Sequence, residues 1–244
     1  MNDRLRPAAD SSALPFADRH DAGIELAASL REYHGRHDVV VLALPRGGVP
    51  VGFEVARILD APLDVFVVRK LGMPGDPEFA IGAIASGGVR VLREDAIRAH
   101  HIPSAAIEAV AQQELAELAR REHDYRQGRP LTPLHGRTVI LVDDGLATGS
   151  SMRAAVEAVR VYQPARVIVA VPVGAPSACE ELAAFTDETV CARRPESFSA
   201  VGRCYRDFSQ TSDAEVRALL TQHAVERAGR STSANSRQRS SESN

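Results

Sequence analysis

The chain has 244 residues, of which 44% are hydrophobic and 25% charged, and its formal net charge is −3. These values are typical of a soluble globular protein with a core of ordinary size. A slightly acidic chain without tryptophan offers no basis for binding nucleic acid or an anionic membrane. No apolar run approaches the ~18 residues of a membrane span, and the N-terminus lacks an apolar signal core. We therefore expect a cytoplasmic protein with neither nucleic-acid nor membrane partners.

Polar stretches lie at both ends of the chain. Residues 1–15 predict a flexible N-terminus, and residues 227–244, rich in Ser, Arg, Gln and Asn, predict a disordered tail. One domain over residues 16–226 is expected between them. The three cysteines are odd in number and widely spaced, so they predict neither a metal site nor a disulfide and are consistent with a reducing cytoplasm. They are Cys179, Cys191 and Cys204.

The domain begins with an amphipathic helix over residues 18–33, followed by an apolar run over 39–44 that predicts a buried strand. The strand leads into Arg46, Gly47 and Gly48, and a helix is expected over 51–59. Two glycines beside a guanidinium suit the close approach of an anion. Taken alone, the same three residues are equally compatible with a plain turn.

The next part of the chain is predicted to be a flexible loop and hairpin over about 69–93. A strand over 63–68 is followed by Arg69 and Lys70, which could contact an anion or form a solvated basic pair. Residues 71–79 contain two prolines and two glycines and are expected to be irregular. Short strands over 80–85 and 89–92 predict a hairpin around residues 86–88.

A mainly helical segment is expected over about 94–127, broken at Pro103. Its adjacent His100 and His101 would point apart on a helix, and no third ligand is spaced with them, so they do not predict a metal site. The basic residues near its end predict a solvated helix end that could also contribute to an anion site. They are Arg120, Arg121, Arg126 and Arg129.

The most informative stretch runs from residue 138 to 152. Four apolar residues predict a buried strand, Asp143 and Asp144 end it, and a helix over 152–162 follows a loop of small and hydroxyl residues. A helix N-terminus binds phosphate through its unpaired amides, whereas carboxylates repel phosphate. The pair would instead face sugar hydroxyls or a phosphate-bound Mg²⁺. A phosphorylated sugar offers a phosphate to the helix N-terminus and hydroxyls to the acid pair. An ordinary Asp-Asp-Gly turn with a Thr/Ser cap remains the alternative.

Further strands are expected over 166–173 and 188–192 with a helix over 178–185 between them, and a last helix over 213–225 capped by Ser212. Strands that alternate with helices predict an α/β fold with a mainly parallel sheet and helices on both faces. Ligands bind beyond the carboxyl ends of such strands. The loops at 45–50 and 143–151 both follow carboxyl ends, so they could meet over one ligand.

The run Val-Asp-Asp-Gly-Leu-Ala-Thr-Gly-Ser-Ser at 142–151 strongly resembles the phosphoribosyl pyrophosphate (PRPP) motif of the type I phosphoribosyltransferases, and the resemblance covers roughly residues 15–225. It implies a twisted, mainly parallel sheet with a small hood and flap and a long helical insertion. It also implies a mobile loop that closes over PRPP from the region after residue 68. A non-proline cis peptide is expected before Arg46 or Gly47. An acceptor-binding hood is expected from the C-terminal part together with the N-terminal segment.

By this resemblance, the acid pair Asp143 and Asp144 binds the ribose hydroxyls, with Lys70 as a further catalytic candidate. The residues implied for the ribose and its 5-phosphate are Asp143, Asp144, Gly145, Ala147, Thr148, Gly149, Ser150 and Ser151. The residues implied for the pyrophosphate are Arg46, Gly47, Gly48, Arg69 and Lys70. The implied cofactor is Mg²⁺, which would arrive with PRPP and be touched by the acid pair.

The implied activity is transfer of ribose 5-phosphate from PRPP to an unidentified nitrogenous base with release of pyrophosphate, by an enzyme that could be a homodimer. Enzymes for hypoxanthine and guanine place an Asp where this chain has Ala147, so a 6-oxopurine mechanism that uses this residue is not expected. The alternative is a regulatory protein that binds PRPP or a nucleotide without catalysis. A phosphoribosyl hydrolase or phosphorylase-like activity, or a partner module for another enzyme, is a further alternative.

Overall fold

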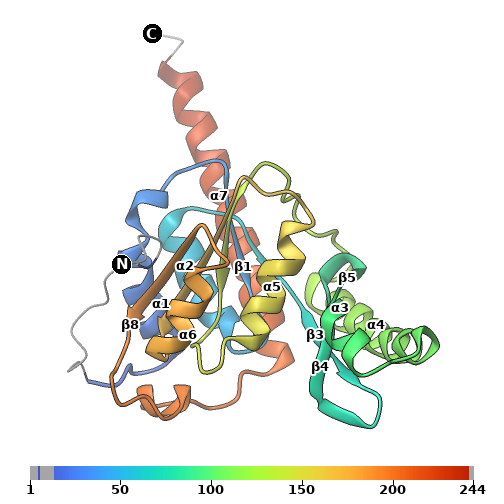
Figure 1. Cartoon of the computed structure of the whole chain (residues 1–244). Helices are drawn as coiled ribbons and strands as arrows, with labels where there is room; N and C mark the ends of the chain where they lie inside the picture. Colours follow the sequence, from blue (N-terminus) through green and yellow to red (C-terminus); the bar gives the residue numbers. More distant parts are fainter. Residues whose placement is uncertain (1–4, 6–13, 242–244) are drawn as a thin grey trace.

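The computed structural model describes Leu5 and residues 14–241, except for the side chains of 77–78 and 231–241. A five-stranded parallel sheet in the order β2-β1-β6-β7-β8 forms its centre (Figure 1). The strands are β1 (Val39–Ala43), β2 (Leu63–Val65), β6 (Thr138–Val142), β7 (Arg166–Val173) and β8 (Glu188–Arg193). The predicted parallel sheet is confirmed.

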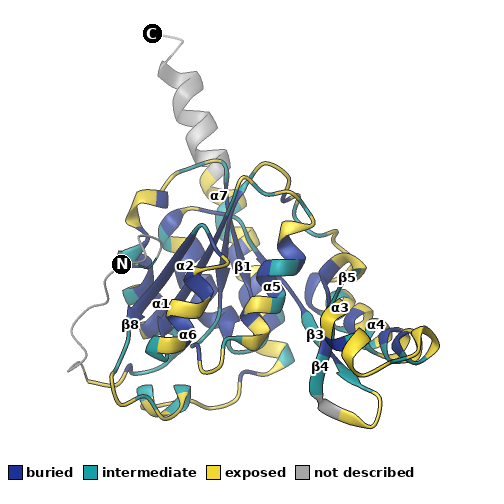
Figure 2. Ribbon diagram, in the orientation of Figure 1, coloured by how far each residue is buried: buried dark blue, intermediate teal, exposed yellow. Residues whose placement is uncertain are grey.

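Helices cover both faces of this sheet because successive strand residues point to opposite sides. On one face, Val139 and Leu141 pack against helices α5 (Ser150–Arg160) and α6 (Pro176–Ala183). On the other, Ile140 and Val142 pack against α1 (Arg19–Ser29) and α2 (Gly48–Leu59). The strands are accordingly buried along their length (Figure 2). Both faces being covered explains why these strands are continuous apolar runs in the sequence.

A second, antiparallel sheet lies beside α5, and we call it the flap sheet (Figure 1). It consists of β3 (Val68–Met73), β4 (Asp76–Ala85) and β5 (Val89–Leu92), in that order. The hairpin predicted around 86–88 is confirmed there. The prediction that 71–79 is irregular is wrong, because Pro74 and Gly75 occupy the β3–β4 turn. The pairing of β3 with β4 is irregular at Leu71–Met73, where its register shifts.

The flap sheet continues into α3 (Glu94–Ala99) and the long helix α4 (Ser104–Arg126). The last residue of α4 is buried rather than solvated, which corrects the prediction for this helix end. Arg126 donates from Nε to Asp64 Oδ1 at 2.9 Å and from Nη2 to the Val65 carbonyl at 2.6 Å. Since breaking a buried ion pair costs about 3–5 kcal/mol, this contact anchors α4 to β2 of the central sheet.

The last helix, α7 (Asp213–Ser241), packs against α2 and α4. The predicted cap is confirmed, since Ser212 Oγ accepts from the amide of Glu215 at 3.1 Å. The helix continues into the region 227–244, for which composition predicts disorder. Arg227 and Arg230 there lie 3.6 and 3.5 Å from Asp60 Oδ1, which ties this part of α7 to the end of α2. Residues 242–244, like 1–4 and 6–13, lie outside the described part.

The cysteines differ from the prediction that no disulfide forms. Cys179 of α6 and Cys191 of β8, both buried, are joined by a disulfide, while Cys204 is a free thiol. Spacing in the sequence could not show this pairing, because it arises from the packing of α6 on the neighbouring strand. Among the described helices, none combines the length and apolar character that a membrane crossing needs.

Buried His223 on α7 makes stability depend on pH. It lies edge-on to the Phe53 ring, and burial, with help from Arg227 and Arg230, lowers its pKa to about 4. The folded state therefore keeps His223 neutral, while the unfolded chain binds a proton as the pH falls below about 6.5. This group contributes stability above pH 6.5 that is lost as the pH falls towards 4, up to about 3 kcal/mol.

We therefore expect the unfolding free energy, measured in urea, to fall by about 2 kcal/mol less between pH 7.5 and 5 in His223→Leu than in the natural sequence. Because the other titrating groups are the same in both proteins, their contributions to the pH dependence cancel in this comparison. Equal losses in both proteins would show that His223 is not the source of this acid sensitivity.

Candidate active site

Two loops at the carboxyl ends of β1 and β6 meet, because these strands are neighbours in the sheet. The amide of Leu44 donates to the carbonyl of Val142 at 2.8 Å. A Cβ placed on Gly47 would lie 2.0 Å from Asp144 Oδ2, and one on Gly48 would lie 2.9 Å from Asp143 Cα. The expected non-proline cis peptide is present between Pro45 and Arg46. The 45–48 loop and the acid pair therefore form one site.

The acid pair is half-buried and directly follows β6. Asp143 Oδ1 accepts from the amide of Asp144 at 2.9 Å, and Asp144 Oδ2 accepts from Arg19 Nε at 2.9 Å. The Tyr205 hydroxyl donates to the backbone carbonyl of Asp144. Burial raises the pKa of both carboxyl groups, and the adjacent charge of Asp144 raises the pKa of Asp143 further. Arg19 opposes both shifts and favours the ionised pair.

The loop that follows presents backbone amides at a helix N-terminus. Helix α5 begins at Ser150 after Gly149, whose φ of +74° favours glycine. The first helical hydrogen bond is donated by the amide of Arg153 to Gly149, so the preceding amides point into the loop. Thr148 Oγ1 lies 3.1 Å from Ser150 Oγ, and both residues are exposed, as is Ala147. This arrangement can accept an anion such as a phosphate.

The Arg-Gly-Gly loop presents one guanidinium at this edge of the sheet. Arg46 Nη1 lies 3.8 Å from Asp213 Oδ1 at the start of α7, and the same oxygen accepts from the Tyr125 hydroxyl at 2.7 Å. The amide of Gly48 donates to the Leu44 carbonyl at 3.0 Å. Gly48 therefore packs closely against the acid pair, and its amide is engaged within the loop.

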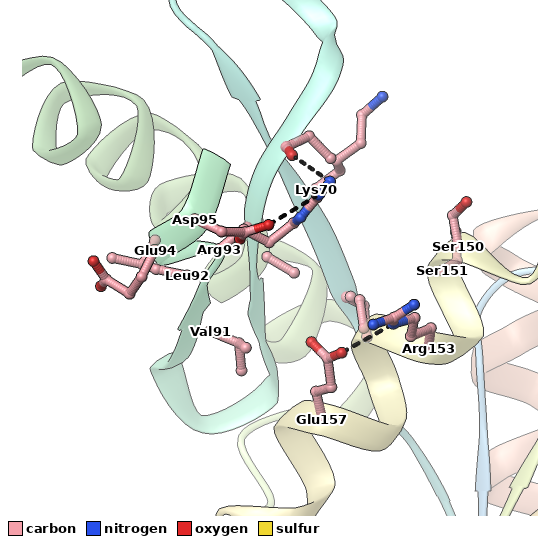
Figure 3. Close-up of a pocket in the computed structure, with 15 residues that line it drawn as sticks. Lys70, Val91, Leu92, Arg93, Glu94, Asp95, Ser150, Ser151, Arg153 and Glu157 are labelled. Carbon is pink, nitrogen blue, oxygen red and sulfur yellow. Dashed lines mark hydrogen bonds and ion pairs between the residues drawn. The ribbon is translucent and has the colours of Figure 1, made fainter. Parts of the chain in front are cut away.

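Arg69 and Lys70 point to opposite faces of the flap sheet because they are neighbours on β3. Arg69 lies against α4, where its Nε and Nη2 atoms both lie 2.6 Å from Glu114 Oε2. Lys70 lines, on the other face, a cleft of about 590 Å³ together with Ser150 and Ser151 (Figure 3). The structure thus places Lys70 and the serines of the expected phosphate loop around one cleft, whereas Arg69 pairs with Glu114.

Comparison with known proteins agrees with this geometry. A family model described as the phosphoribosyl transferase domain matches residues 17–207. The chain belongs to the phosphoribosyl transferase family. A solved structure, TT1426 from Thermus thermophilus, is similar with a TM-score of 0.78 and 46% identity, covering 86% of this chain and 99% of that one.

Two Mycobacterium tuberculosis proteins, provisionally named phosphoribosyl transferases, are each 51% identical to this chain over 205 residues. The match covers 84% of this chain and 46% of each of theirs. The chain therefore spans about half the length of these curated relatives.

The structure adds to the candidate site an arginine that the sequence did not indicate. Arg19 reaches the acid pair from α1, and its guanidinium stacks 4.0 Å from the centre of the Phe208 ring. The Tyr205 ring in turn packs against Phe208, with their ring centres 5.0 Å apart. No local pattern marks Arg19, because it lies 125 residues before its partner Asp144. The expected combination of N-terminal and C-terminal segments is nevertheless present, since Phe16 and Tyr205 form a β-bridge.

Proposed function

We propose that this chain transfers ribose 5-phosphate from PRPP to a nitrogen nucleophile, with release of pyrophosphate and inversion at the anomeric carbon. The observation that carries the proposal is the contact between Gly47 and the carboxylate of Asp144. This contact joins an anion-binding turn to a pair of carboxylates, and the phosphate loop at 147–151 follows directly. A sugar that bears both a phosphate and a pyrophosphate is complementary to all three parts.

The residues would act mainly by positioning and by charge. Departure of pyrophosphate leaves positive charge on the ribose ring, which the carboxylates of Asp143 and Asp144 would stabilise while they hold its hydroxyls. Arg46 and the amide of Gly47 would offset the negative charge that grows on pyrophosphate. Lys70 would approach from the flap sheet and help exclude water from the reacting ribose.

Mg²⁺ is proposed as the companion of PRPP. Among the described residues, no three His, Cys, Asp or Glu side chains are grouped to hold a metal ion. One oxygen of Asp144 is already engaged by Arg19. Two half-buried carboxylates, one of them already paired with Arg19, fit an ion that arrives with pyrophosphate and is contacted through water molecules. They do not suit an ion held by the protein alone. When bound, it would neutralise charge on the leaving pyrophosphate.

The acceptor is proposed to be a base that needs no carboxylate from the phosphate loop. Ala147 is exposed at the position where hypoxanthine and guanine enzymes have an Asp. An acceptor that presents a neutral, already nucleophilic nitrogen would meet this condition. We also propose a cytoplasmic location and nucleotide metabolism as the setting.

The test is consumption of PRPP with Mg²⁺ in the presence of a panel of nitrogenous bases. Release of pyrophosphate that depends on one base would support transfer. Release without any base would instead indicate a hydrolase. Tight binding of PRPP without turnover would favour the regulatory alternative, and absence of binding would rule out both.

Arg46→Ala is expected to weaken PRPP binding on the order of 10- to 100-fold, because a charge-assisted contact to pyrophosphate is lost. Ribose 5-phosphate lacks the pyrophosphate, so its dissociation constant should change little. Calorimetric titration of both ligands measures the difference. Arg69→Ala is the matched control, since its guanidinium pairs with Glu114 and should leave both constants unchanged. Equal losses for the two ligands in Arg46→Ala would contradict the pyrophosphate assignment.

A further inference from the structure

Arg19 connects the acid pair to the C-terminal segment 205–209. Its Nε donates to Asp144 Oδ2 at 2.9 Å, and its Nη1 donates to the carbonyl of Ser209 at 2.7 Å. The face of the guanidinium stacks on the Phe208 ring at 4.0 Å. Only 11% of the Arg19 side chain is exposed. Such a group is held in one geometry by three independent contacts, unlike a surface arginine.

The backbone fixes the position from which Arg19 projects. The amide of Phe16 donates to the Cys204 carbonyl at 2.9 Å, and the amide of Arg206 donates back to the Phe16 carbonyl at 2.8 Å. The amide of Asp207 donates to the Ala17 carbonyl at 3.0 Å. Two segments that are 190 residues apart in sequence thus form one wall of the site, and Arg19 lies where this wall meets the acid pair.

The surroundings of Asp144 leave one of its oxygens for a ligand. Oδ2 is enclosed between Arg19 and Gly47, where a Cβ would lie 2.0 Å away. The other titratable groups that face this carboxylate are Asp143 and the Tyr205 phenol. Within the described part of the chain, Arg19 is the single cation paired with either member of the acid pair. Oδ1 of Asp144 is therefore the oxygen left for a ribose hydroxyl.

We propose that Arg19 is a positioning residue that fixes Asp144 Oδ1 towards the ribose, while holding segment 205–209 against the sugar site. This inference rests on the proposed PRPP-dependent function. Arg19 acts through Asp144 and need not touch the reacting atoms. Its loss leaves Asp144 Oδ2 without its guanidinium donor, so the carboxylate would no longer be held in one orientation.

The experiment compares Arg19→Met with Arg193→Met. Arg193 is a close structural match, because its guanidinium stacks on Phe16 at 3.7 Å, pairs with Glu25 of α1 and donates to the Leu14 carbonyl. It holds the same N-terminal segment without contacting the acid pair. Dissociation constants for PRPP with Mg²⁺ are measured by calorimetry, together with melting temperatures. Each dissociation constant is expressed as its ratio to that of the natural protein.

The dissociation constant is expected to rise about tenfold in Arg19→Met and to stay unchanged in Arg193→Met. Arg19→Lys should restore part of the affinity, because lysine keeps the positive charge but lacks the planar guanidinium with its several donors. The lysine variant also provides the test if the methionine variant does not fold.

A ratio near one for Arg19→Met, or an equal loss of affinity in Arg193→Met, would overturn the positioning role while leaving PRPP binding established. Failure of the natural protein itself to bind PRPP would overturn the proposed function and this inference together. The two failures are thus distinguished by the first titration.

Discussion

Asp144→Asn is expected to reduce PRPP affinity by at least about 100-fold while leaving the protein folded. The substitution removes the negative charge that is proposed to accept hydrogen bonds from the ribose hydroxyls and to stabilise positive charge on the ring. It preserves shape, and its amide oxygen can still accept from Arg19 Nε. It also removes repulsion from Asp143, whose pKa is raised by burial and by the charge of Asp144. The melting temperature should therefore change little or rise.

Calorimetric titration with PRPP and Mg²⁺ measures the affinity. Asp38→Asn is a suitable control, since this carboxylate precedes β1 at the opposite end of the strand and pairs with Arg36. The control should bind PRPP with the affinity of the natural sequence. Retained affinity in Asp144→Asn would remove the ribose assignment, and with it the main reason for treating the chain as an enzyme that uses PRPP.

Gly47→Ala is the second substitution with a large expected effect, on the order of 100-fold or more in PRPP affinity. The φ of Gly47 is −59°, an angle that any residue adopts, so the glycine is required by space and not by backbone conformation. A Cβ there would lie 2.0 Å from Asp144 Oδ2 and 3.3 Å from Arg19 Nε. Either the loop or the carboxylate must move, and either displacement would disrupt the arrangement of the two.

The same titration, with melting temperature as a check of folding, tests this expectation. Gly229→Ala is the control, because a Cβ there meets nothing within 4 Å, and alanine favours the helix that contains it. It should leave PRPP affinity unchanged. If Gly47→Ala binds PRPP like the natural sequence, the loop and the acid pair do not share one ligand.

The architecture followed from local patterns wherever a segment was buried on both faces. The apolar runs that become β1, β6 and β7 predicted central strands of a parallel sheet, because only such strands are apolar on both sides. The same reasoning failed at residues 71–79. The prolines and glycines there predict irregular structure, whereas Pro74 and Gly75 lie in the β3–β4 turn and the flanking residues pair as strands.

The arrangement of the candidate site was predictable where its residues are neighbours in sequence. Asp143, Asp144 and the loop at 147–151 form one strand–loop–helix unit, so their order alone indicates a phosphate and a sugar. The two basic residues after residue 68 show the limit of such reasoning. Alternation on a strand sends Lys70 towards α5 and Arg69 towards Glu114 of α4, and the presence of α4 on that face was not readable from the motif.

By itself, then, the sequence determined the order of strands and helices, the two glycine-containing loops and the acid pair, since these depend on contacts between residues close along the chain. Tertiary structure alone decided that Arg19 and segment 205–209 close around Asp144, that Arg126 is a buried anchor, and that Cys179 meets Cys191. The physical reason is distance along the chain. Partners 125 residues apart meet only because the packed sheet brings their elements together, and no local pattern records that meeting.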